Sequence, residues 1–275
     1  MKNIFKSIFC LFIALPFYSA AQTAADKKVQ AGLTFNAGAN FLSPSSSRIK
    51  INGAGSIVSV GLNLHSAFKS SPNLAIATGL EFDFGKNKFS LNDSTRADYD
   101  DGEYLTKEQA ETYDNDNDIT TNYLTYNIES RIVSTTKLTI PLMLLFRTNF
   151  IGDFRYFGKF GIRNTFLLSH SIEDSGGQLG GNNDNNILMS SPGEMFLYNG
   201  SIGLTAGAEW NFVGSTCLVL EAGYYYGITP YFLDRKDDNK TMYNVGTELI
   251  FPPSRSYYSA SARQNQLIFK LSILF

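Results

Sequence analysis

The stretch Gln266-Leu267-Ile268-Phe269-Lys270-Leu271-Ser272-Ile273-Leu274-Phe275 decides the fold. Every odd position from 267 to 275 is apolar, whereas the even positions include Gln266, Lys270 and Ser272. A period of two is typical of a β-strand with one apolar and one polar face. A face that meets lipid, a face that lines a polar interior and an aromatic final residue together favour a strand of a transmembrane barrel. The predicted lipid-facing residues, which we also interpret as the assembly signal, are Leu267, Phe269, Leu271, Ile273 and Phe275.

Seven further segments alternate in the same way. The clearest runs from Val29 to Phe41, and the others lie near residues 58–64, 74–84, 138–147, 154–166, 201–210 and 218–227. The predicted fold is therefore all-β: a transmembrane antiparallel β-barrel of eight strands, connected as an up-and-down meander.

The segment from Leu138 to Arg147 is the weakest of the eight. Met143 and Leu145 make both of its faces apolar, which also suits a soluble strand buried on both sides. Pro141 cannot donate a hydrogen bond to a neighbouring strand. We expect a bulge or a strand start at Pro141, with the even positions facing outward.

The predicted connections alternate in length. Those at 69–73, 148–153 and 213–216 are short, whereas those at 43–55, 86–136, 170–195 and 230–261 are long and polar. Short turns on one side and long loops on the other are typical of a bacterial outer-membrane barrel with extracellular loops. Aromatic residues fall near both ends of the predicted strands, as expected at the two membrane interfaces.

The N-terminal residues predict export. Lys2 and Lys6 precede the apolar run from Ile8 to Phe17, and Ser19-Ala20-Ala21 supplies small residues for cleavage. We predict a signal peptide over 1–21 and one outer-membrane β-barrel domain over 22–275. The apolar run is too short to cross a bilayer of about 30 Å as a helix, so we expect the chain to be exported without a helical anchor. Together with the predicted barrel strands, this makes the cell outer membrane the expected location.

Charge and cysteine content exclude some classes. Lys and Arg number 23 against 25 Asp and Glu, and two of the lysines lie in the predicted signal peptide. The acidic excess argues against a nucleic-acid partner. Removal of the signal peptide leaves Cys217 alone, so no intramolecular disulfide can form.

Four short motifs carry a resemblance to a known family. Ala37-Gly38-Ala39-Asn40, Leu138-Thr139-Ile140-Pro141-Leu142, Ala206-Gly207-Ala208-Glu209 and the final Phe275 resemble the PorT-like outer-membrane β-barrel family of Bacteroidetes, over about residues 29–275. The resemblance implies an eight-stranded barrel and no agreed catalytic residues. It also implies that some relatives assist a secretion system.

The expected interior is polar and filled. Eight strands enclose a space just wide enough for side chains, and charges held there must be paired. Glu221 and Lys270, on neighbouring strands, are expected to touch. We interpret the network as structural, and the alternative is a narrow channel for ions or small solutes. The charged residues predicted to point inward are Glu81, Asp83, Arg147, Arg155, Lys159, Arg163, Glu209, Glu221 and Lys270.

The acidic stretch at 92–118 is predicted to be a mobile, exposed loop. Within it, Asp114-Asn115-Asp116-Asn117-Asp118 resembles a calcium loop, but Ile119 replaces the turn glycine and Thr125 the bidentate glutamate. We therefore expect a solvated loop and no metal or cofactor site.

An enzyme is the rival from another class, since some small outer-membrane barrels modify lipid A. His170 lies between Ser169 and Ser171, but adjacent strand residues point to opposite faces, and position 172 is Ile. His65 is expected to be an inward, hydrogen-bonded structural residue.

We predict no catalysis, but a structural, surface-interaction or secretion-accessory role for the long loops. The expected partners are outer-membrane lipid, lipopolysaccharide, the barrel-assembly machinery and an envelope or secretion-system protein.

Overall fold

A computed structural model describes most of the chain after the predicted signal peptide. The predicted signal peptide at 1–21 and residues 92–94 and 116–118 of the acidic stretch lie outside the described part. The described residues are 28–45, 47–91, 95–115, 123–179, 187–188, 195–213, 216–232, 236–245, 255–259 and 261–275.

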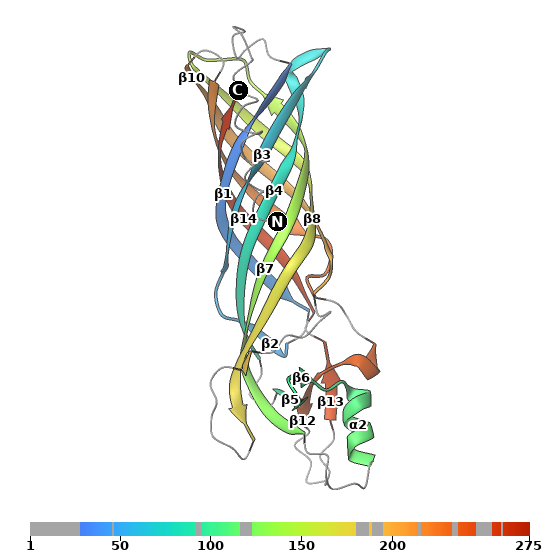
Figure 1. Ribbon diagram of the computed structural model, residues 1–275. Coiled ribbons are helices and arrows are strands. Elements are labelled where there is room, and N and C mark those ends of the chain that lie inside the picture. Colours follow the sequence, from blue (N-terminus) through green and yellow to red (C-terminus); the bar gives the residue numbers. More distant parts are fainter. Residues whose placement is uncertain are drawn as a thin grey trace, which may run out of the picture.

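Eight antiparallel strands form a closed ring (Figure 1). Each strand pairs with the next one along the chain, and the ring closes where β14 pairs with β1. The predicted up-and-down barrel is therefore confirmed. The strands are β1 (Val29–Pro44), β3 (Gly55–Phe68), β4 (Ser71–Leu91), β7 (Leu124–Arg147), β8 (Phe154–Gln178), β10 (Tyr198–Val213), β11 (Thr216–Gly227) and β14 (Ala262–Leu274).

The barrel strands turn apolar residues outward and polar residues inward. On β14, Phe269 has 59% of its surface exposed, whereas its neighbour Lys270 is buried. On β10, Leu204 is 66% exposed and its neighbour Thr205 is buried. Exposed apolar side chains around a polar interior are the reverse of a water-soluble barrel and suit contact with lipid. No helix in the described part of the chain is long and apolar enough to cross a membrane.

The end of the barrel with the short turns also carries the closing contacts. Phe275 donates its backbone N–H to the carbonyl of Ala31 at 2.8 Å, beyond the last pair of the β1–β14 ladder. Phe154 and Trp210 stack on the outer surface nearby, with ring centroids 5.9 Å apart. These rings lie where the sequence predicts an aromatic belt.

The expectation for Pro141 is wrong in its detail. β7 begins at Leu124, so Pro141 lies well inside the strand and does not start it. The β4–β7 ladder is interrupted between the pairs Thr78–Leu142 and Glu81–Thr139, but its register does not shift, so there is no bulge here. The hydroxyl of Thr78 donates to the Pro141 carbonyl at 2.8 Å inside this gap. A local gap in the ladder therefore accommodates the missing N–H.

The described parts of the long connections contain regular secondary structure. β4, β7 and β8 extend beyond the other strands, and residues 95–115 of the predicted mobile loop are folded. Short elements gather at this end of the barrel: β2 (Ile49–Ile51), β5 (Thr95–Asp100), β6 (Glu103–Tyr104), α2 (Lys107–Asn115), β9 (Ile187–Leu188), η3 (Asp237–Asn239), β12 (Met242–Val245) and β13 (Arg255–Tyr258).

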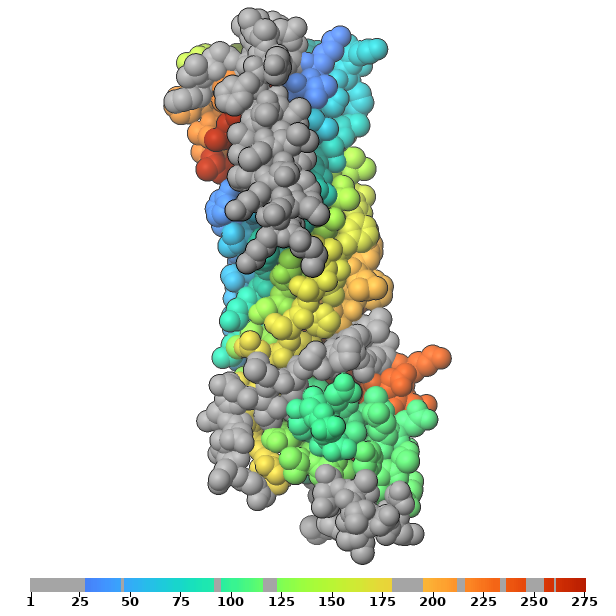
Figure 2. All heavy atoms as spheres, in the orientation of Figure 1, coloured from blue at the N-terminus to red at the C-terminus, as the bar shows by residue number. Residues whose placement is uncertain are grey.

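We call residues 95–115, 236–245 and 255–259 the cap. Its strands continue the barrel sheet, because β5 pairs with the extension of β7 and β12 lies between β5 and β13. Figure 2 shows the cap as a lobe of green and orange-red atoms at one end of the barrel.

The cap and the barrel mouth share one hydrophobic core. Phe89 of β4 and Val133 of β7 are fully buried there against cap residues that include Met242 and Tyr258. Tyr231 and Phe232, from the connection after β11, lie in the same cluster with ring centroids 4.9 Å apart. Burial of these rings links the cap to the barrel by apolar packing.

Candidate functional site

The barrel interior holds the predicted charges in layers. Near the short turns, Glu209 on β10 accepts hydrogen bonds from Arg155 at 2.5 and 3.2 Å, and Arg147 lies 3.9 Å away. Gln30 joins this layer by donating to Glu209 at 3.3 Å and accepting from Arg147 at 3.0 Å. All of these side chains are buried, so the carboxylate is shared by two guanidinium groups away from bulk water.

A second layer couples Glu221 on β11 with Lys159 on β8, at 2.6 Å. These strands are not neighbours in the ring, since β10 lies between them. The pair is buried, and its partners were both predicted to point inward.

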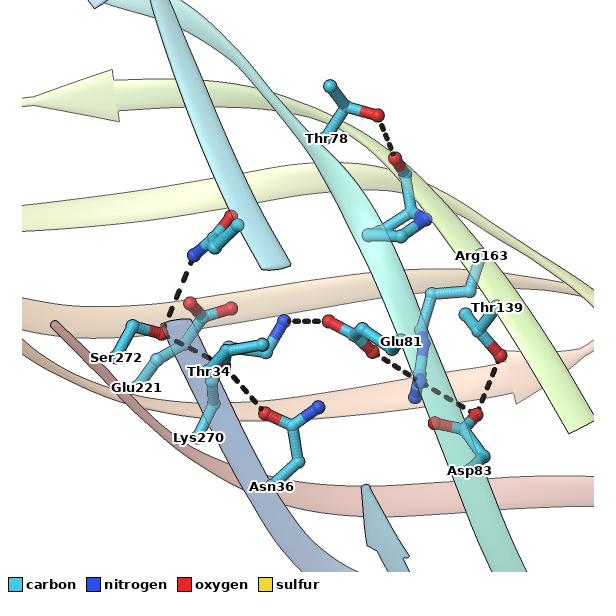
Figure 3. A network of polar contacts seen from close by, with 12 residues as sticks. Thr34, Asn36, Thr78, Glu81, Asp83, Thr139, Arg163, Glu221, Lys270 and Ser272 are labelled. Carbon is cyan, nitrogen blue, oxygen red and sulfur yellow. Dashed lines mark hydrogen bonds and ion pairs between the residues drawn. The ribbon is translucent and has the colours of Figure 1, made fainter. Parts of the chain in front are cut away.

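The central layer is the most extensive (Figure 3). The ammonium of Lys270 lies 2.5 Å from one carboxylate oxygen of Glu81, and Arg163 contacts the other at 2.8 Å. Arg163 also lies 3.1 Å from Asp83, which accepts a hydrogen bond from the Thr139 hydroxyl at 2.6 Å. The side chains come from β4, β7, β8 and β14, so this layer spans the lumen.

The predicted contact between Glu221 and Lys270 is not the ion pair that forms. The two residues are direct partners in the β11–β14 ladder, but Lys270 reaches Glu81 and Glu221 reaches Lys159. Figure 3 shows the Lys270 side chain directed toward Glu81, with Glu221 beside it. A long side chain in a narrow lumen can reach a partner on another wall as easily as its ladder neighbour.

Packing fills the space that the charges leave. A Cβ atom on Gly203 would lie 2.2 Å from the Tyr225 ring, so the absence of a side chain there admits this ring into the interior. The Arg163 guanidinium lies over the same ring, 4.9 Å from its centroid. Phe157 and Leu274 add apolar packing toward the short-turn end.

Two charged sites were missed by the sequence prediction. Lys137 on β7 is buried, and Arg131 of the same strand makes a buried ion pair with Asp174 at 2.7 Å. Both lie before Leu138, where the predicted fourth strand begins. A period-two alternation that includes both residues was present, because the buried odd positions of β7 continue without interruption from Arg131 to Arg147.

The two histidines occupy different environments. His65 is buried and its Nδ1 lies 2.9 Å from Arg147, as expected for a structural histidine. His170 borders a hollow of about 360 Å³ on the barrel wall, together with Ser169 and Ser171. Both serines are exposed, whereas His170 is opposite the buried Thr135, so the serines and the imidazole do not share a face.

The cap has its own polar centre. Asp98 is buried and accepts hydrogen bonds from Tyr243 at 2.8 Å and Thr125 at 2.7 Å, with Arg255 at 3.6 Å. Burial, followed by the charge of Asp98, raises the pKa of the Tyr243 hydroxyl. The Asp98 charge is also the main factor that raises the pKa of Arg255, against the opposing effect of burial. The cap therefore holds a buried carboxylate with hydrogen bonds and one cation.

The described residues of the cap do not form a metal-binding site. Asp114, the first residue of the predicted calcium-like run, contacts Arg255 at 2.7 Å and Tyr123 at 2.5 Å. Among all described residues, no group of three or more His, Cys, Asp or Glu side chains is arranged to hold a metal ion. Cys217 is buried and not in a disulfide.

Comparisons with known proteins agree with this architecture. The family model described as outer membrane protein beta-barrel domain matches residues 20–233. No match was found among curated proteins.

Several solved structures align over most of the chain. The outer membrane protein OprG from Pseudomonas aeruginosa is 10% identical, with a TM-score of 0.42 over 90% of this chain and 93% of that chain. Neisserial surface protein A is 9% identical, with a TM-score of 0.34 over 90% and 98% of the two chains. Ail, the attachment invasion locus protein of Yersinia pestis, is 9% identical, with a TM-score of 0.32 over 90% and 100%. These values carry no functional argument. The family match shows that the chain belongs to the outer membrane protein β-barrel domain family.

Proposed function

We propose that this protein is a sealed outer-membrane anchor that presents the cap as a surface-interaction module. The observation that carries this proposal is the shared core of cap and barrel mouth, which buries Phe89, Tyr231 and Tyr258 together. A conducting pore needs an open mouth, whereas this end is covered by packed aromatic residues. The layered ion pairs below it support the same conclusion, because they fill the lumen.

The exposed surface of the cap supports an interaction role. Glu108, Glu111, Asp237 and Asp238 lie on α2 and η3. Lys107 forms ion pairs with both aspartates of η3, and Lys240 pairs with Asp237. The resulting surface is acidic and is held in place by the core beneath it. We infer that it faces the outside of the cell and binds an envelope or secretion-system protein with a basic surface.

The lipid environment is inferred from lysines just beyond the aromatic residues. Lys86 and Lys88 share the outer face of β4 with Phe84, and Lys50 of β2 pairs with the adjacent Ser90. All three ammonium groups are exposed near the predicted outer interface. Ammonium groups at this level of the barrel can form ion pairs with the phosphates of lipopolysaccharide. The outward apolar side chains of the barrel would then contact the acyl chains.

The proposed role also includes subgroup membership, a route to the outer membrane and the absence of catalysis. The motifs on β1, β7 and β10, together with Phe275, support membership of the PorT-like subgroup of Bacteroidetes. Export through the predicted signal peptide and insertion by the barrel-assembly machinery follow from an outer-membrane location. We also propose that the protein is not an enzyme, since Ser169 and Ser171 do not share a face with His170.

Planar-bilayer recording tests the sealed anchor. The purified protein should show no steady conductance, and Tyr231→Ala with Phe232→Ala should increase brief openings. A stable, ion-selective current from the unaltered protein would support the channel instead.

Site-specific cross-linking from Glu111 in native membranes tests the interaction surface. Its signal should disappear when Glu108 and the acidic residues of η3 are changed to Lys. Unchanged lipid A in cells with and without the protein would agree with the absence of catalysis.

A further inference from the structure

Lys137 is a buried cation that contacts only neutral groups among the described residues. Its ammonium donates to the side-chain oxygens of Asn199 and Gln264, each at 3.1 Å. It also lies over the Tyr231 ring, 4.4 Å from the centroid. Only 4% of its surface is exposed. Two of its three N–H donors are therefore directed to amides, and one remains for another ligand.

The other interior cations differ from Lys137 in one respect. Arg147 and Arg155 share Glu209, and Lys159 pairs with Glu221. Arg163 and Lys270 are held by the central carboxylates. In the described part of the lumen, Lys137 is thus the cation without a carboxylate within ion-pair distance. An isolated ammonium in such a place must lose its proton or acquire a counter-ion, because burial of an unpaired charge is costly.

A small polar cavity adjoins the Lys137 ammonium. Its volume is about 20 Å³, and hydroxyl and amide side chains line it, including Thr165, Ser201, Thr229 and Gln266. No carboxylate belongs to this lining. A space of that size accommodates one water molecule or one ion of similar size. The cavity therefore combines a positive charge with hydrogen-bond donors and excludes large ligands.

We propose that this cavity binds a small monovalent anion, of the size of chloride, as the counter-ion of Lys137. The anion accepts the remaining ammonium N–H and a hydrogen bond from the Ser201 hydroxyl, since the Thr165 and Thr229 hydroxyls already donate to Thr139 and to the Tyr198 carbonyl. It neutralises the one interior cation that the protein leaves unpaired in the described lumen. Tyr231 lies next to the ammonium and belongs to the core below the cap, so the proposed site adjoins that core.

Anion-dependent unfolding of the full mature protein in detergent micelles tests the proposal. At constant ionic strength, replacement of gluconate by chloride or bromide should raise the unfolding midpoint, in proportion to the logarithm of halide concentration once the site saturates. Lys137→Met should remove this dependence. The control Lys69→Met changes an exposed lysine in the short turn between β3 and β4 and should retain it.

Two outcomes would overturn the proposal: a midpoint that ignores the identity of the anion, or an equal halide effect in Lys137→Met and the unaltered protein. If Lys137→Met does not fold, anomalous diffraction from crystals of unaltered protein grown in bromide replaces it. A bromide peak beside the Lys137 ammonium supports the site, and a water molecule there in high bromide refutes it. Neither test depends on a partner of the cap or on conductance, so its failure is separable from failure of the proposed function.

Discussion

Glu221 and Lys270 face each other across the β11–β14 ladder, yet each makes its ion pair with a different strand. Lys270 joins β14 to β4, and Glu221 joins β11 to β8. Both pairs bypass the nearest strands in the ring. These two ion pairs therefore link strands that are not neighbours in the ring, in addition to the backbone ladders that link neighbours.

This arrangement predicts which double substitution rescues the barrel. Lys270→Met should destabilise the protein by about 3 kcal/mol, at the lower end for a broken buried pair, because Glu81 keeps Arg163. Glu81→Gln combined with Lys270→Met should recover much of the loss, as measured by urea unfolding in micelles. The matched control combines Glu221→Gln with Lys270→Met and should give no rescue. Rescue by Glu221→Gln but not by Glu81→Gln would mean that Glu221 is the true partner.

The outer face of β14 predicts an insertion defect. Leu271→Asp and Ile273→Asp place a charge on residues that are 41% and 42% exposed toward lipid. Arg or Lys at mid-membrane costs about 2–4 kcal/mol and Asp somewhat less, so the double variant should insert poorly. Deletion of Phe275 should also impair closure, since its backbone bonds to Ala31. Heat-modifiable mobility measures the folded fraction, with Asn149→Asp in a turn as the control. Normal mobility of the variants would contradict this prediction.

Cysteine labelling tests the orientation. An impermeant maleimide added to intact cells should label Glu111→Cys on α2 but not Asn149→Cys in the short turn. The native Cys217 is buried and should not react. The reverse pattern would place the cap in the periplasm and remove the basis for a surface role.

Alkaline pH should loosen the cap. Tyr243 has a raised pKa in the folded protein, so it binds its proton more tightly when folded than when unfolded. Its contribution to stability is fully present below about pH 10, the ordinary tyrosine value, and is lost as pH rises through the raised pKa. The labelling rate of a cysteine placed at buried Ala97 should therefore increase as the pH rises above about 10. Tyr243→Phe should flatten this increase, and an unchanged pH profile in that variant would count against the role of Tyr243.

The strand pattern was predictable because a period of two fixes which residues face inward. All nine predicted interior charges are buried, including Glu81 and Lys270. Their pairing was not predictable, since it depends on distances across the lumen that sequence spacing does not encode. Lys137 was not predicted because it precedes the predicted strand at 138–147, although β7 begins at Leu124.

The cap was missed for a different reason. Its strands are short, and an acidic composition such as that of residues 95–115 usually indicates a solvated loop. Its order depends on apolar residues from distant parts of the chain, such as Phe89 and Met242. Local composition cannot show that such residues meet.

The closing of the ring by β1 and β14 has a consequence for biogenesis. Thr34 and Ser272 touch across this seam, although 238 positions separate them in the chain. β1 thus has one edge without its partner until β14 has left the inner membrane, and an unpaired edge can pair wrongly. Folding cannot finish progressively from the N-terminus, so the exported chain must stay unaggregated until both ends are available together.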